Sequence, residues 1–145
     1  MNLVSSINPQ NILVSIDDTD KKSVIAKLVD ALYETGEITD KKEFIDDVYF
    51  REEEGITGIG NGLAIPHGRN EFVKNSSFAI ATLKQSVEWG SIDDEPVKVV
   101  ILLADSLDGK PIMLDKFMKK LSDEDKLHFL KEATSVSDVI SVLDR

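Results

Sequence analysis

Apolar residues recur along the chain with two spacings, and each spacing predicts one kind of element. Between residues 20 and 36 the apolar positions lie three or four apart, which places them on one face of an amphipathic helix. Asp17-Asp18-Thr19-Asp20 supplies candidate N-caps, and Gly36 is placed to end that helix. Similar stripes predict helices after Thr39 or Asp40, after Pro111, around Leu127 and from Val136 to Leu143.

Shorter apolar runs predict strands over residues 11–16, 78–83 and 97–104. The last of these contains Val99–Leu103, a continuous apolar run that is typical of a strand buried on both faces. Helical and extended segments alternate, and no repeat, low-complexity tract or domain boundary interrupts them. We therefore expect residues 1–145 to form a single α/β domain, with helices on both faces of a sheet whose strand order the pattern leaves open.

Residues 51–69 have a different character, because five of the chain's eight glycines lie between Gly55 and Gly68. Glycines clustered in this way permit positive φ and close backbone approach, so we predict a shaped loop. Leu63–Ile65 is short and apolar and predicts a buried strand. Since Pro66 disfavours helix at the preceding residue, we expect His67 at a strand end, where open α/β sheets commonly present functional groups.

The same segment carries groups suited to anion chemistry. Arg51, Arg69 and Thr57 are candidate phosphoryl ligands, and the glycine-rich backbone at Asn61–Gly62 is able to aim N–H donors at an anion. Histidine forms covalent intermediates and titrates near neutral pH, so His67 is the candidate nucleophile of a phosphohistidine site. The alternative is a structural histidine. A nucleotide-binding loop fits poorly, because the Lys-Ser/Thr of a P-loop is missing.

Composition narrows the partners and the compartment. The formal charge is −10, with 27 acidic against 17 basic residues, so nucleic-acid binding is disfavoured. Cysteine is absent, which excludes disulfides and thiolate metal sites. We find no apolar run long enough to span a bilayer and no secretory signal, and we expect a cytoplasmic protein without membrane insertion.

Residues 51–52 and 57–68 together resemble the phosphorylation signature of the fructose–mannitol (type 2) class of phosphotransferase-system enzyme IIA domains, which includes nitrogen-regulatory members. The segments around residues 11–13, 32–36, 87–93 and 96–100 extend the resemblance over most of the chain. It implies a mixed sheet and a phosphotransferase in which His67 accepts a phosphoryl group. The donor would be the histidine-containing phosphocarrier protein, and an enzyme IIB domain would receive the group in sugar uptake.

The resemblance also implies roles for individual residues. Arg51 would neutralise the phosphoryl oxygens, Thr57 would add a hydrogen bond, and Arg69 is a weaker candidate. It implies neither a metal nor an organic cofactor. Sugar-transport members carry a second histidine at the start of the helix after the buried strand, and Lys110 takes that place here. A lysine there supplies positive charge but no neutral imidazole. The chain's other histidine, His128, lies in no motif.

Three other functions stay open at this point. One is a regulatory phospho-switch of the nitrogen type, in which phosphorylation controls protein binding instead of sugar uptake. Another is a binding module that has kept the fold and lost phosphorylation, which the intact loop disfavours. The third, a nucleotide-binding enzyme, has little support. The sequence does not predict which sugar is served or the oligomeric state.

Overall fold

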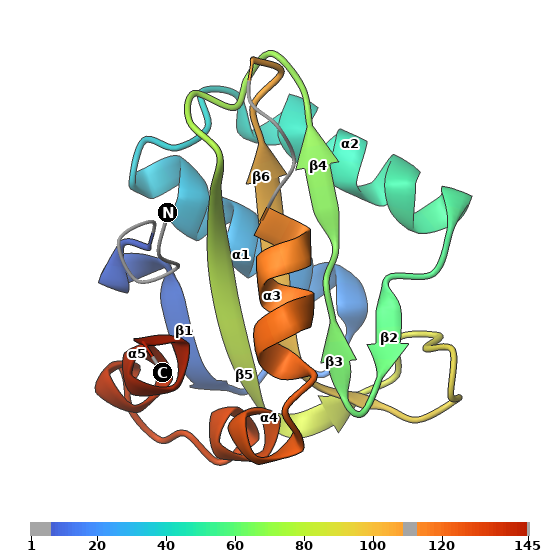
Figure 1. Ribbon diagram of the computed structural model, residues 1–145. Coiled ribbons are helices and arrows are strands. Elements are labelled where there is room, and N and C mark those ends of the chain that lie inside the picture. Colours follow the sequence, from blue (N-terminus) through green and yellow to red (C-terminus); the bar gives the residue numbers. More distant parts are fainter. Residues whose placement is uncertain (1–6, 109–112, 145) are drawn as a thin grey trace.

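Two long antiparallel strands, β5 (Ser77–Val87) and β6 (Val97–Asp105), form the centre of the sheet (Figure 1). The computed structural model describes residues 7–108 and 113–144. A short 3₁₀ turn, η2 (Pro9–Asn11), leads into β1 (Ile12–Ile16), which pairs in parallel with the outer edge of β5.

Three short strands from the glycine-rich segment complete the sheet. β3 (Leu63–Ala64) and β4 (His67–Arg69) pair one after the other in parallel with β6, and β2 (Gly58–Gly60) pairs antiparallel with β3. The order is β1-β5-β6-β3-β2, with β4 also beside β6. The six-stranded sheet is therefore mixed, as the family resemblance implied.

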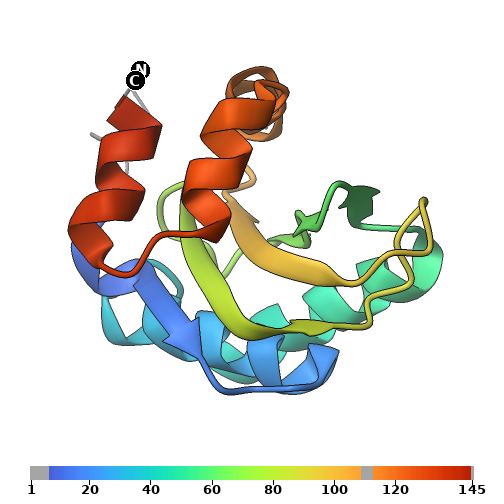
Figure 2. The same cartoon turned by 90° about the horizontal axis from the view of Figure 1, so that it is seen from below.

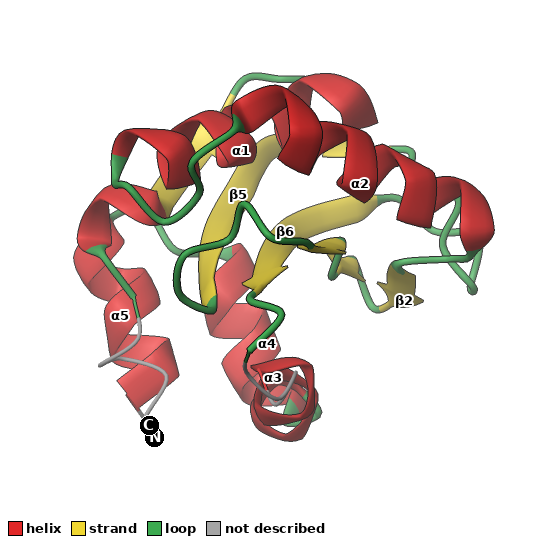
Figure 3. Cartoon of the chain, turned by 90° about the horizontal axis from the view of Figure 1, so that it is seen from above, coloured by secondary structure: helices red, strands yellow, loops and turns green. Residues whose placement is uncertain are grey.

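Helices cover both faces of this sheet, which confirms the predicted architecture. α1 (Lys21–Glu34) and α2 (Lys41–Glu54) lie on one face, while α3 (Met113–Leu121), α4 (Glu124–Lys131) and α5 (Val136–Asp144) lie on the other (Figures 2 and 3). Asp20 and Asp40 cap α1 and α2 by accepting hydrogen bonds from the backbone N–H of Ser23 and Glu43. These caps explain why each helix begins at the residue that follows.

The two faces hold separate apolar cores, and β6 contributes alternate residues to each. Val100, Leu102 and Ala104 pack towards α1 and α2. Val99 and Ile101 pack towards the C-terminal helices. Because successive side chains of a strand point to opposite faces, the unbroken apolar run predicted this two-sided burial.

The glycine-rich segment is more regular than the loop we predicted. Its backbone forms a β2–β3 hairpin whose turn has positive φ at Gly60, Asn61 and Gly62 (98°, 56° and 78°). His67 does not end the strand that begins at Leu63; it begins β4, after a break at Ile65 and Pro66. The break arises because Pro66 has no N–H for a sheet ladder, although its carbonyl oxygen still accepts a hydrogen bond from Leu103 N.

Substitution of Gly68 by alanine should destabilise the fold, because α2 packs directly on β4 at this residue. An added Cβ would lie 2.8 Å from Phe44 Cε1 and 3.0 Å from Val48 Cγ2, and both side chains are fully buried. Overpacking of this kind costs about 1–3 kcal/mol, which urea unfolding would measure. The matched control is Gly55→Ala, since no atom lies within 4 Å of its added Cβ. Equal effects of the two substitutions would contradict this packing.

Candidate functional site

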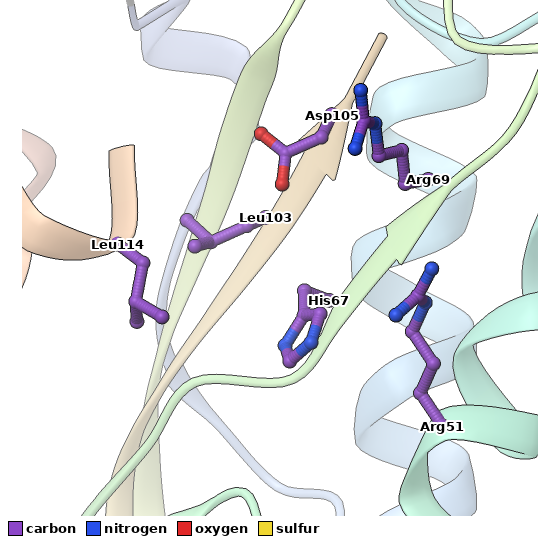
Figure 4. Close-up of a pocket in the computed structure, with 6 residues that line it drawn as sticks. All are labelled: Arg51, His67, Arg69, Leu103, Asp105 and Leu114. Atoms are coloured by element: carbon purple, nitrogen blue, oxygen red, sulfur yellow. The ribbon is translucent and has the colours of Figure 1, made fainter. Parts of the chain in front are cut away.

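A pocket of about 250 Å³ opens where β4 lies beside the end of β6 (Figure 4). In the parallel pairing His67 lies opposite Leu103, and Arg69 lies opposite Asp105. Alternate residues of a strand share a face, so these four side chains point to the same side of the sheet. Arg51 reaches the pocket from α2, and Leu114 from α3.

One carboxylate, that of Asp47 on α2, ties the basic residues of the pocket to the sheet. Its Oδ2 accepts a 2.7 Å hydrogen bond from the backbone N–H of Arg69 and lies 3.4 Å from Arg51 Nε. Arg69 also donates from Nη2 to the carbonyl oxygen of Leu107. The positive groups are thus positioned by contacts from α2 and from the loop after β6. Asp47, which our sequence analysis did not single out, is the residue that orients Arg51.

The His67 ring is half-buried, and its Nδ1 lies 3.4 Å from the carbonyl oxygen of Ile65. When Nδ1 carries the proton, it donates to that oxygen and leaves the lone pair on Nε2. The ring therefore has a contact that favours one tautomer. A histidine in this tautomer presents Nε2 as its nucleophilic nitrogen.

Asp105 is another residue that the sequence pattern did not reveal, and it lines the pocket itself. It is 6% exposed, and its Oδ1 has no hydrogen-bond partner among the residues that the structure describes. Burial raises the pKa of the Asp105 carboxyl, while the nearby His67, Arg69 and Arg51 act in the opposite direction. A carboxylate at the end of a wholly apolar run was the available signal, because a charge is seldom buried without a reason.

Thr57 does not line the pocket, although we expected its hydroxyl to bind the phosphoryl group. Its hydroxyl lies 2.6 Å and 2.7 Å from the two carboxylate oxygens of Glu52, and it accepts a 2.9 Å hydrogen bond from Trp89 Nε1. Lys21 Nζ completes this network 3.4 Å from Glu52 Oε1. The backbone holds Thr57 just before β2, so its side chain contributes to a buried polar cluster that joins α1, α2 and the β5–β6 connection.

Asn61 and Gly62 also lie away from the pocket. They border a separate hollow of about 480 Å³, together with Lys98 and Lys131. Leu63 pairs with Val99 and His67 with Leu103, so about 13 Å of strand separates the hairpin turn from the histidine. Lys110 lies outside the described residues. His128 is exposed on α4.

Other kinds of site have little support. In residues 7–108 and 113–144, no three His, Asp or Glu side chains gather in a way that could hold a metal ion. No helix of the described chain has the length and hydropathy needed to cross a membrane.

Comparison with known protein families assigns the chain to one of them. The model for the phosphoenolpyruvate-dependent sugar phosphotransferase system, EIIA 2, matches residues 5–145. The chain belongs to this EIIA family. The membership agrees with the resemblance of the signature segment around His67 and with the mixed α/β fold.

Relatives of the EIIA family occur both as separate proteins and as parts of larger ones. The chain is 31% identical to the 2-O-alpha-mannosyl-D-glycerate-specific EIIABC component of Escherichia coli strain K12, with 99% of this chain aligned to 23% of that protein. It is 31% identical to a mannitol-specific enzyme IIA component of Staphylococcus aureus, with 92% of each chain covered. It is 28% identical to the transcriptional regulator ManR of Bacillus subtilis, with 97% of this chain and 21% of the regulator covered.

Solved structures of EIIA proteins share the fold. The nitrogen regulatory protein IIA-Ntr of Neisseria meningitidis superimposes with a TM-score of 0.87 at 23% identity, with 97% of both chains covered. The IIA mannitol protein of Escherichia coli gives 0.84 at 22% identity, with 94% of this chain and 98% of that chain covered. These likenesses confirm the architecture.

Replacing Thr57 with valine should destabilise the EIIA fold, because it removes the hydroxyl that joins Glu52 to Trp89. The expected loss is about 1–3 kcal/mol in the free energy of unfolding, the usual effect of leaving buried polar groups unpaired. Urea unfolding followed by the fluorescence of Trp89 would measure it. Thr57→Ser retains the hydroxyl and should remain near wild type; a valine variant as stable as the serine variant would contradict the structural role.

Proposed function

We propose that the protein is a phosphocarrier in which His67 accepts a phosphoryl group from the histidine-containing phosphocarrier protein and passes it to an enzyme IIB domain. The observation that carries the proposal is the pocket that joins His67 to Arg51 and Arg69. Membership of the EIIA family supports phosphotransfer in general terms. A structure that superimposes on the chain is described as a complex of enzyme IIAMTL with phosphorylated enzyme IIBMTL of Escherichia coli, which supports the choice of acceptor.

The acceptor atom in this proposal is Nε2 of His67. The Ile65 carbonyl oxygen beside Nδ1 favours a proton on that nitrogen, which leaves the lone pair on Nε2. The lone pair attacks phosphorus in line with the breaking P–N bond of the donor, and the electron pair of that bond stays on the donor nitrogen. The proton on Nδ1 is retained throughout. Passing the group on reverses the sequence towards the next acceptor.

Two guanidinium groups would stabilise the negative charge on the oxygens of the phosphoryl group during transfer. Arg51 lines the pocket from α2 with its side chain 38% exposed, and Arg69 lines it from β4. Arginine suits this task because its planar fork can donate two parallel hydrogen bonds to phosphoryl oxygens. Since Asp47 holds Arg51 near β4, less ordering is required when the phosphoryl group arrives.

Transport and regulation share phosphorylation of His67 and differ in the use made of the phosphoryl group. Identity of 29–31% to fructose- and mannitol-specific EIIA components, over more than nine-tenths of each chain, favours sugar uptake. The match to a transcriptional regulator favours keeping the phospho-switch as the alternative. Phosphoryl transfer from the phosphorylated protein to purified IIB domains of the same organism would support transport. Stable binding of another protein by one phosphorylation state, without transfer, would support regulation.

Substitution of His67 by alanine should abolish phosphoryl acceptance. We expect wild-type protein incubated with phosphoenolpyruvate, enzyme I and the histidine carrier protein to gain the mass of one acid-labile phosphoryl group. His128→Ala is the matched control, because His128 is exposed on α4 away from the pocket, and it should gain the same adduct. No adduct on wild type, with a carrier protein from the same organism shown to be phosphorylated, would overturn the proposed function.

Substitution of Arg51 by glutamine should slow phosphoryl transfer while leaving the fold intact, because it removes a positive charge from the pocket and keeps a long polar side chain. Loss of one preorganised group of this kind costs about 10²–10³-fold in rate. Arg51→Lys keeps the charge without the bidentate fork, and we expect an intermediate rate. Rapid-quench measurement of phosphoprotein formation would test the order. A glutamine variant as fast as wild type would remove Arg51 from the mechanism.

A further inference from the structure

Asp105 places a carboxyl group inside the pocket that the proposed function assigns to a phosphoryl group. It is the last residue of β6, lies opposite Arg69, and comes two residues after the Leu103 that pairs with His67. Figure 4 shows its carboxyl group at the end of β6, on the side of that strand where the Leu114 side chain lies, while the His67 ring lies between β6 and β4. The backbone pairing therefore places Asp105 diagonally across from His67, and both side chains line the same pocket.

The surroundings of this carboxyl group are poor for a charge. The residue is 6% exposed, and within the described chain Oδ1 is buried without a hydrogen-bond partner. Burial of a carboxylate favours its neutral form, and burial raises the pKa of Asp105 accordingly. The nearby guanidinium groups of Arg69 and Arg51 favour the ionised form and oppose this effect. Burial and nearby positive charge thus act on the protonation of Asp105 in opposite directions, and a new charge in the pocket would shift that protonation.

A phosphoryl group would be such a charge. Its oxygens are negative, and an ionised carboxylate beside them would repel them. The same oxygens would bind the arginines, whose charge otherwise stabilises the carboxylate. A neutral carboxyl group, in contrast, has an O–H donor, and a phosphoryl oxygen is a strong acceptor for it. Protonation therefore converts Asp105 from a group that repels the phosphoryl oxygens into one that donates a hydrogen bond to them.

We propose that Asp105 takes up a proton when His67 is phosphorylated and donates it in a hydrogen bond to a phosphoryl oxygen. The proposal rests on the proposed function. In the transfer, a P–N bond forms at His67 Nε2 as the donor's P–N bond breaks, and one proton from the solvent adds to the Asp105 carboxylate. When the phosphoryl group leaves for the next acceptor, that proton returns to the solvent. No other reactant is required.

The charged groups around Asp105 are those of the pocket. β4 contributes His67 and Arg69, and α2 contributes Arg51, whose charge is partly offset by Asp47. Of the described residues of α3, Leu114 lines the pocket. The two arginines, Arg51 and Arg69, are groups that a phosphoryl group would also attract.

Proton uptake makes phosphorylation depend on pH with a definite sign. The phosphorylated protein binds one more proton, at Asp105, than the free protein does. Lower pH therefore favours the phosphorylated protein. As the pH rises by one unit, the factor that Asp105 contributes to the equilibrium constant for phosphorylation falls tenfold. This holds between the pKa of the carboxyl in the free protein and its higher pKa in the phosphoprotein. Outside that interval the contribution is constant.

Carbon NMR of the aspartate carboxyl groups in wild-type protein tests the proton uptake directly. The Asp105 signal is assigned by its absence from Asp105→Asn and is titrated before and after phosphorylation. We expect the carboxyl to bind its proton at least about tenfold more tightly in the phosphoprotein, because the added negative charge disfavours the carboxylate. Equal or weaker proton binding after phosphorylation would overturn the proposal.

Phosphorus NMR of the phosphoprotein tests the hydrogen bond. The phosphoryl resonance of wild type should move through a titration step that coincides with that of the Asp105 carboxyl, and Asp105→Asn should lack this step. The control is Asp94→Asn, since Asp94 is exposed in the β5–β6 connection and has a φ of 60° that asparagine tolerates well. This control should keep the step; a step that persists in Asp105→Asn would overturn the proposal.

The two proposals fail in different ways. If wild-type protein takes up no phosphoryl group, the proposed function fails and the role of Asp105 fails with it. If the group is accepted at His67 and the Asp105 carboxyl titrates as it did before, the phosphocarrier remains and only the proton site is lost. If Asp105→Asn does not fold, the Asp105 carboxyl signal is assigned in wild-type protein through its bonded backbone nuclei, and the comparison of wild-type protein before and after phosphorylation still decides.

Discussion

The parallel pairing of β4 with the end of β6 is the constraint on which the candidate site depends. It brings His67 and Arg69, from a three-residue strand, beside a central strand that is buried on both faces. A strand so short has little stability of its own, because each residue of an isolated pair gains few contacts for the entropy it loses. Its position therefore relies on β6 at one side and on α2 above it.

Contacts from α2 supply the second part of that support. Phe44 and Val48 pack against Gly68, where a larger residue would collide with them, and Asp47 accepts a hydrogen bond from the backbone N–H of Arg69. The same carboxylate holds Arg51 at the pocket. Helix and strand thus share one set of interactions, and the arrangement of the basic groups results from the packing that keeps the sheet together.

Polar groups near the glycine-rich segment fall into two clusters with different environments. Glu52, Thr57 and Trp89 satisfy one another in a buried network, whereas Asp105 lines the pocket with an oxygen that has no partner in the described chain. Neighbouring residues of α2 serve both clusters, because Arg51 lies at the pocket and Glu52 lies in the network. A mutually satisfied cluster contributes to stability. A buried carboxyl oxygen that has no hydrogen-bond partner among the described residues calls for an explanation, which the proposed role of Asp105 supplies.

The sequence by itself determined the helices and the doubly buried strand, and it pointed to His67 as the candidate phosphoryl acceptor. Periodicity is a local property, so the stripes of α1 and α2 and the run Val99–Leu103 were legible without the fold. The signature around Pro66–His67 likewise sufficed to indicate phosphohistidine chemistry by resemblance. Tertiary structure alone decided which groups share the pocket with His67. Thr57 and Asp105 show why: one is near His67 in sequence and turned into another cluster, and the other is 38 residues away and lies beside it through strand pairing. Register between distant strands and the direction of a side chain depend on long-range contacts, which no local pattern encodes.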